Sequence, residues 1–167
     1  MWKLLVSSFV VLQFAAHRPR AFPQGGPAES CDSMLPRHVY TAPRPAHESP
    51  YTFVASSSHY SYQNVDGIQV ELGGAAFKGF FIAAIDPATS RRIGTFLRVK
   101  GTHPVKCSAV THNDNQPKSH VSLLWLPPDN VPEGNVVFMA TVVNSYSRYY
   151  TGLIASVPAA GYAAKKK

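Results

Sequence analysis

The sequence predicts an all-β domain, built as an antiparallel sandwich of two sheets with about seven or eight strands. Short runs of β-branched and aromatic residues recur along the chain, with turn-forming residues between them. Helical amphipathicity is weak and no heptads occur. The 167 residues suffice for one domain with a substantial core, but not comfortably for two. A two-sheet sandwich is the architecture that this pattern favours.

The central stretch of the chain covers residues 77–99, FKGFFIAAIDPATSRRIGTFLRV. Residues 80–85 are apolar at odd and even positions alike, which predicts a strand covered on both faces. A buried helix is the alternative, but the shortness of the run and Gly79 favour a strand. Residues 86–90 predict a turn, and residues 93–99 a second strand. We therefore expect a β-hairpin in the middle of the sheet.

The other strands are expected on both sides of this hairpin. Two precede it, at residues 51–55 and 68–72, and the second is a clean alternation of apolar and polar residues. Trp125 alternates with Val121 and Leu123 and is therefore expected in the core. The strands expected after the hairpin cover residues 107–112, 121–126, 136–143 and 149–154.

The N-terminus has the pattern of a secretory signal peptide. Lys3 precedes the apolar run 4–12, and small residues follow at 15 and 16. A membrane anchor is the alternative, but the run is well short of the ~20 apolar residues that span a bilayer. We expect residues 1–16 to be removed, with cleavage as late as residue 21 the second option. No second such segment follows, so residues 17–167 are expected to be secreted, with no membrane span.

Secretion makes the two cysteines, Cys31 and Cys107, expected partners in a disulfide. Closing so long a loop stabilises a fold by roughly 4 to 5 kcal/mol on chain-entropy reasoning, an upper figure. The segment 22–50 around Cys31 is rich in Pro and Gly and has no periodicity. Since Pro lacks the donor that a sheet ladder needs, this segment is expected to run over the surface, tied down at Cys31.

Several pieces of the sequence, taken in order, resemble a known family. SCDSMLPRH is followed by FKGFFIAAID, RRIGTFL, a cysteine with AVTH, VSLLWLPP and VVFMATVV. This series is similar to the reeler (reelin-type) domain, over about residues 22–150. In its length the chain resembles the small secreted insect defence proteins made of one reeler domain. The resemblance implies an immunoglobulin-like β-sandwich, and its cysteines match Cys31 and Cys107.

An enzyme is not expected. The strongest catalytic candidate is a histidine near a carboxylate, His112 with Asp114, and serines lie nearby at Ser108 and Ser119. Nucleophilic catalysis needs a base held against the nucleophile and an oxyanion hole, and no G-x-S-x-G elbow is present. His112 lies next to a turn, so a loop histidine that bonds the backbone is the better interpretation. The histidines lack metal-ligand spacing, so no metal or cofactor is expected. Reeler domains also occur in membrane ferric reductases beside a b-type cytochrome, a redox module not expected here.

The charge favours anionic partners. Sixteen basic and nine acidic residues give +7, and loss of Lys3 with the signal peptide leaves +6. A basic secreted surface favours polymers such as lipopolysaccharide or teichoic acid. The alternative is a solubilising surface with a disordered basic tail, Lys165 to Lys167. Nucleic acid is disfavoured by location, and a membrane-lytic amphipathic helix is absent. The candidate ligand-binding residues form a stripe along the central hairpin, namely Arg91, Arg92, Arg98 and Lys100.

Two classes of function follow. The first, implied mainly by the resemblance, is a secreted innate-immune defence protein that binds microbial surfaces, with antimicrobial action as one outcome. The second is an extracellular adhesive or matrix module that binds a host protein or glycan. The sequence does not predict the oligomeric state.

Overall fold

The computed structural model describes residues 22–61 and 67–158 of the chain. Helix α1 (Ser30–Ser33) and the 3-10 helix η1 (Ala46–Glu48) are each about one turn long. All other regular elements within these ranges are strands. They are β1 (Arg44–Pro45), β2 (Tyr51–Ala55), β3 (His59–Ser61), β4 (Ile68–Phe77), β5 (Gly79–Ile85), β6 (Thr95–Phe96), β7 (Thr102–Val105), β8 (Ala109–His112), β9 (Lys118–Leu126), β10 (Glu133–Asn135), β11 (Val137–Ser145) and β12 (Arg148–Ile154).

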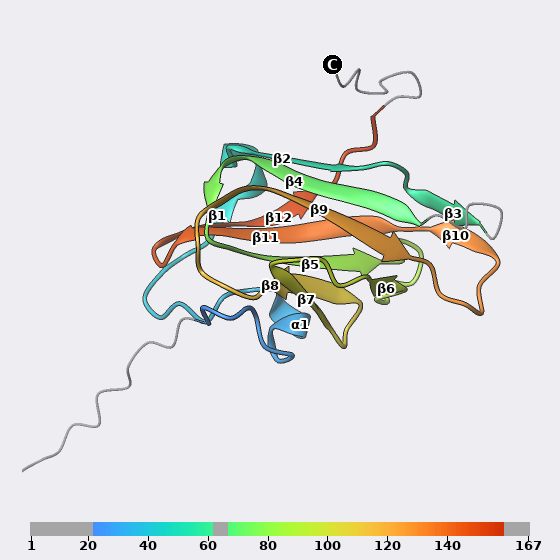
Figure 1. Cartoon of the computed structure of the whole chain (residues 1–167), viewed down its shortest axis with the longest axis horizontal. Coiled ribbons are helices and arrows are strands. Elements are labelled where there is room, and N and C mark those ends of the chain that lie inside the picture. Colours follow the sequence, from blue (N-terminus) through green and yellow to red (C-terminus); the bar gives the residue numbers. More distant parts are fainter. Residues whose placement is uncertain (1–21, 62–66, 159–167) are drawn as a thin grey trace, which may run out of the picture.

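The strands form a sandwich of two main sheets, as the sequence predicts (Figure 1). One sheet has the order β1-β12-β11-β5-β8-β7, the other β2-β4-β9-β6, and β10 pairs with β3 in a small ribbon. All these pairs are antiparallel except β1 with β12. β1 lies at an edge, which accommodates its proline.

The main core lies between the two sheets. Trp125 of β9 is fully buried there, as the alternation of its strand predicts. Its ring makes edge contacts with Tyr60 and Phe138, at centroid distances of 5.4 and 5.6 Å. Its indole Nε1 donates a hydrogen bond to the Ile93 carbonyl at 3.0 Å, so its one polar group is also satisfied.

Strand β5 is buried on both faces, which confirms the prediction from its unbroken apolar run. Phe80, Ile82 and Ala84 belong to the core between the sheets. Phe81 and Ala83 point the other way, into a second cluster that includes Cys31 and Met34. The cover of this outer face is therefore the irregular segment that precedes η1, seen as the blue chain with α1 beneath the sheet in Figure 1.

The predicted central hairpin is only partly present. The turn forms as expected, because the Asp86 carboxylate accepts bonds from the Ala88 amide at 2.8 Å and the Thr89 hydroxyl at 2.7 Å. The chain then pairs with β5 through a single bridge between Ile85 and Arg92. Beyond it, the chain leaves the sheet of β5 and joins the opposite sheet as β6.

The crossing between the sheets has a local cause. Gly94 has a φ of +66°, a left-handed conformation that favours glycine. A Cβ at Gly94 would lie 2.3 Å from Cζ2 of Trp125, so the backbone passes directly against the indole. Residues 93–99 therefore contribute only β6, which pairs with β9 at Phe96 and Trp125. The prediction of a strand over all of 93–99 was wrong.

The remaining predicted strands are present, most of them with shifted bounds. β2 has the predicted bounds, and the strands expected at 68–72, 121–126, 136–143 and 149–154 correspond to β4, β9, β11 and β12. The strand expected at 107–112 begins only at Ala109, because Ser108 takes a positive φ of 52°. The sequence did not predict β1, β3, β7, β10 or α1. These elements are two to four residues long and show no hydrophobic period of their own.

A disulfide joins Cys31 and Cys107, with a Cα–Cα distance of 6.1 Å and a sequence separation of 76. It holds α1 against the connection that follows β7. The proposed signal peptide, residues 1–16, and the terminal lysines Lys165 to Lys167 lie outside the described residues.

Candidate functional site

Three of the four predicted ligand-binding residues are exposed on two neighbouring connections. Arg91 lies between β5 and β6, while Arg98 and Lys100 lie between β6 and β7. β6 ends at Phe96, so Arg98 and Lys100 lie in the connection after it and not in the strand that was predicted over residues 93–99. Within the described part of the chain, none of the three forms an ion pair with a carboxylate.

Arg92 makes a structural contact instead. Its guanidinium donates a hydrogen bond to the backbone carbonyl of Cys31. Burial lowers the pKa of Arg92, and the charge of Asp32 opposes this shift. A second guanidinium nitrogen, Nη1, is buried and has no hydrogen-bond partner within residues 22–61 and 67–158. Arg92 therefore joins the connection after β5 to α1, and it is the predicted site residue least available to a ligand.

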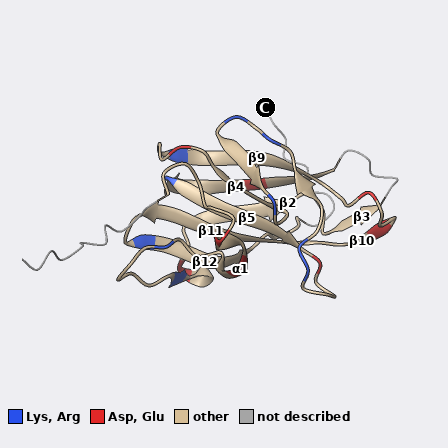
Figure 2. Cartoon of the chain, turned by 90° about the horizontal axis from the view of Figure 1, so that it is seen from below, with Lys and Arg blue, Asp and Glu red and all other residues tan. Residues whose placement is uncertain are grey.

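The basic residues do not gather in one patch. Figure 2 shows Lys and Arg on several connections and strand ends around the sandwich. Two of them are paired with a carboxylate four residues away, Arg44 with Glu48 at 3.7 Å and Lys118 with Asp114 at 2.7 Å. A ligand that uses these charges would therefore be a long polymer that spans several of them, rather than a small anion bound in one pocket lined by arginines.

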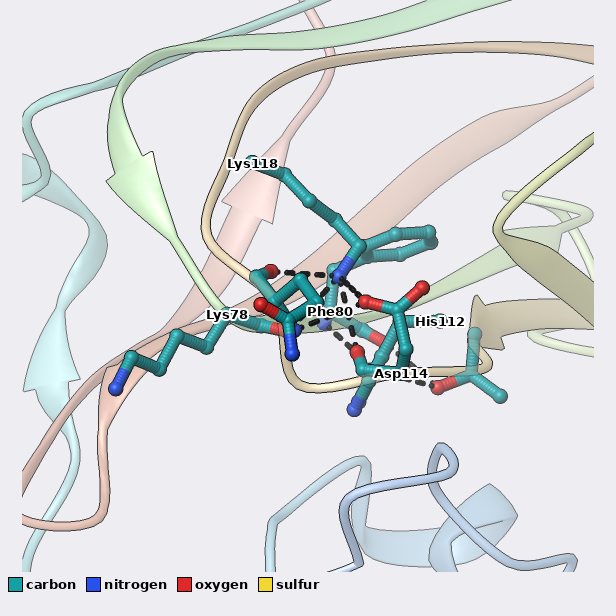
Figure 3. Close-up of polar contacts among 7 residues, drawn as sticks. Lys78, Phe80, His112, Asp114 and Lys118 are labelled. Carbon is teal, nitrogen blue, oxygen red and sulfur yellow. Dashed lines mark hydrogen bonds and ion pairs between the residues drawn. The ribbon is translucent and has the colours of Figure 1, made fainter.

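His112, the strongest catalytic candidate, is buried at the end of β8 with 9% of its surface exposed. Its Nδ1 accepts a hydrogen bond from the Phe80 amide at 3.1 Å (Figure 3). Burial is the main cause that lowers the pKa of His112, so the neutral ring is favoured. The predicted bond to the backbone is confirmed, although the histidine lies in a strand rather than in a loop.

The Asp114 carboxylate is occupied by other partners. Lys118 Nζ donates to its Oδ1 at 2.7 Å, and the Gln116 amide donates to the same oxygen at 2.9 Å. These bonds, with Lys118 first, hold the pKa of Asp114 below its usual range. Lys118 also donates to the backbone carbonyls of Asp114 and Gln116, at 2.9 and 2.8 Å (Figure 3). Asp114 thus organises the turn between β8 and β9 and does not orient His112.

These contacts give the turn a structural role and not the geometry of a hydrolase. Nucleophilic catalysis requires a hydroxyl held against the base. The Thr111 hydroxyl lies 3.2 Å from Nδ1 of His112, but it donates to the Phe80 carbonyl at 2.7 Å, and Nδ1 accepts from the Phe80 amide, so both groups are engaged with the backbone. Across residues 22–61 and 67–158, no three metal-ligand side chains cluster, and no helix is long and apolar enough to cross a membrane.

Sequence reasoning missed how the N-terminal segment is attached beside His112. The Gly26 amide donates to the Thr111 hydroxyl at 3.0 Å. A Cβ at Gly25 would lie 2.2 Å from the His112 carbonyl oxygen, and one at Gly26 would lie 2.8 Å from the Phe81 ring. The adjacent glycines at 25 and 26 were the available signal, since paired glycines allow such close approach to a sheet.

The comparisons with known proteins agree with this fold. Residues 29–159 match the Reeler domain. Defense protein l(2)34Fc of Drosophila melanogaster is 32% identical over 163 residues, which cover 92% of this chain and 96% of that protein. Ferric-chelate reductase 1 of Bos taurus is 30% identical over 158 residues, which cover 87% of this chain but only 25% of the reductase.

The chain thus spans about a quarter of the length of the reductases that it matches, and their name describes much longer proteins. The defence protein matches it over nearly the whole length of both chains, which fits a defence role and a non-enzymatic one. The crystal structure of the human F-spondin reeler domain superposes with a TM-score of 0.53 at 17% identity, covering 72% of this chain and 96% of that one. The fold, the cysteine pair and the match over most of the sequence together place this chain in the reeler domain family.

Proposed function

We propose that this chain is an extracellular defence protein that binds the anionic polymers of microbial surfaces, such as lipopolysaccharide or teichoic acid. The observation that carries the proposal is the correspondence with the Drosophila defense protein over nearly the whole length of both chains. The disulfide suits an oxidising, extracellular environment. The net charge of +7 adds attraction to phosphate-bearing polymers.

The residues proposed to contact the polymer are Arg91, Arg98 and Lys100. All three are exposed and have no carboxylate partner among the described residues, so a polymer phosphate would not have to compete with an ion pair there. Arg92 supports them indirectly, because its bond to Cys31 holds the connection that carries Arg91. Contacts between exposed charges are weakened by salt, so binding should be strongly salt-dependent.

The test is a binding assay with purified lipopolysaccharide and with whole cells. The triple variant Arg91→Ser/Arg98→Ser/Lys100→Ser is compared with a charge-matched control, Arg37→Ser/Arg44→Ser/Arg148→Ser. We expect the first to weaken binding roughly tenfold, since three exposed pairs at about 0.5 kcal/mol each amount to about 1.5 kcal/mol. The control should bind like the parent, and both should keep the parent's melting temperature.

Equal loss in both triple variants would show that only net charge matters, and would overturn the assignment of these three residues. Failure of the parent to bind both lipopolysaccharide and whole cells would overturn the proposed function itself. Retention of the parent by host matrix in that case would favour the adhesive module.

A further inference from the structure

A cavity of about 230 Å³ lies between the outer face of the six-stranded sheet and the N-terminal segment. Its floor includes Gly79 and Phe81 of β5 with Thr141 and Val143 of β11. Its cover includes Phe22 and Met34 of the N-terminal segment. This cavity is not formed by the basic residues proposed to bind polymers.

The cover is fastened on both sides of the cavity. On one side, the disulfide fixes Cys31, and the Gly26 amide bonds Thr111. On the other side, the His38 ring stacks on the Tyr146 ring at a centroid distance of 4.4 Å. A cover held at both ends keeps the cavity open without a ligand, so binding would need little reorganisation.

The cavity is apolar and large enough for a small ligand. Side chains and backbone of aromatic and aliphatic residues make up most of its wall. The two histidines in the wall, His38 and His112, both have pKa values lowered by burial, so neither favours a charge there. Dry apolar cavities of about 150 Å³ already bind benzene, and this one is larger.

Among the described residues that line the cavity, Lys78 is the one with a permanent positive charge, and none is a carboxylate. Lys78 is exposed and lines the cavity, and its ammonium forms no ion pair among the described residues. Figure 3 shows its side chain extending away from the Asp114–Lys118 network, which leaves the ammonium free for an anion. An apolar body beside a single unpaired cation is the arrangement that suits an amphiphile with one negative charge.

We propose that this cavity binds a medium-chain fatty acid, with the acyl chain against Phe81 and Val143 and the carboxylate at Lys78. The neutral, apolar wall accepts the methylenes, and Lys78 pairs with the head group at the solvent-exposed side. This activity does not depend on the binding of microbial polymers.

Isothermal titration calorimetry of the secreted protein with octanoate, decanoate and dodecanoate tests the proposal. Each additional buried methylene should strengthen binding roughly fourfold, until the chain outgrows the cavity and the gain stops. Decanol should bind more weakly than decanoate, by about threefold, because it lacks the charge that pairs with an exposed lysine. No binding of any of the three acids would overturn the proposal, and so would a gain that continues unchanged to hexadecanoate, since this reports nonspecific partition.

Two kinds of variant locate the ligand. Val143→Trp fills the cavity from its floor and Ser145→Trp obstructs it from a half-buried wall position, and each should weaken decanoate binding more than about tenfold. Lys78→Ser should reduce decanoate binding to the level of decanol, while Lys106→Ser, at an exposed lysine outside the cavity wall, should not. Melting curves establish that each variant is folded. Unchanged binding in both tryptophan variants would overturn the site, and unchanged binding in Lys78→Ser would overturn the assigned head-group contact.

Discussion

Single residues in this domain act mainly through burial. Trp125 is the clearest case, because it is fully buried, meets two aromatic rings and satisfies its indole N–H on the Ile93 carbonyl. Its alternation with apolar neighbours was enough to predict its place in the core. Burial stabilises an apolar ring such as that of Trp125, but it penalises the charged form of a histidine. It therefore lowers the pKa of His112.

Truncating the core tryptophan should cost much of the domain's stability. Trp125→Ala is expected to lower the free energy of unfolding by roughly 3 to 5 kcal/mol, through lost burial and the cavity that remains. Leu97→Ala, at a residue 40% exposed, is the control and should change it by less than about 1 kcal/mol. Urea unfolding followed by circular dichroism measures both. A parental midpoint for Trp125→Ala would contradict the buried role.

His112 should make the domain less stable in acid. Its folded-state pKa lies below the ordinary value of 6.5, so below about pH 6.5 the unfolded chain binds more protons than the folded one. The contribution of the neutral His112 to the free energy of unfolding is therefore fully present above that pH and is lost as the pH falls toward the folded-state pKa. Unfolding free energies measured between pH 7.5 and 5 should decline less in His112→Asn than in the parent. His59→Asn, at an exposed histidine, is the matched control, and a decline equal in all three proteins would exclude His112 as the cause.

At the scale of elements, the sequence predicted strands where the hydrophobic pattern is strong and failed where tertiary contacts decide. β5 was predicted because six consecutive apolar residues need cover on both faces. The path of the chain after β5 was not predicted, because a hairpin and a crossing to the other sheet can begin with the same turn. The choice depends on Gly94 meeting the Trp125 ring, thirty-one positions further along, and no local pattern records that contact.

Two glycines with positive φ allow the effect of backbone conformation to be measured apart from the effect of packing against Trp125. Gly94 and Gly101 have φ values of +66° and +84°, but only Gly94 faces a close neighbour, and nothing lies within 4 Å of a Cβ at Gly101. Gly101→Ala should cost about 1 to 2 kcal/mol of stability from backbone strain alone. Gly94→Ala should cost at least about 2 kcal/mol more, through collision with the indole. Equal losses in chemical denaturation would show that the indole does not direct the crossing.

At the scale of the whole molecule, the outer face of a sandwich sheet is covered by residues 22–38, which form no strand. The proline-rich composition predicted that this segment stays out of the central sheet and is tied at Cys31. The cavity could not be predicted, because its wall combines residues 22–38 with residues 78–81 and 141–146, which only the fold brings together. The sequence shows which residues are basic, but it does not show which of them bond to other parts of the chain. Arg92 was therefore predicted to bind a ligand, although its guanidinium donates to the Cys31 carbonyl.

The disulfide should matter most for this cover. In the double variant Cys31→Ser/Cys107→Ser, the Gly26–Thr111 bond and the Arg92–Cys31 contact remain, but the long loop is no longer closed. We expect the unfolding free energy to fall by about 2 to 5 kcal/mol. Relative to the parent, exchange with solvent should accelerate much more at the Gly26 amide than at the amide of Leu72 in β4, which lies in the other sheet.

Equal acceleration at both sites would mean that the disulfide stabilises the domain globally. Labelling of both cysteines in the native parent would contradict the disulfide itself. Selective loss of protection at Gly26 would show that the sandwich folds without its cover and that the cysteine pair keeps the cover in place.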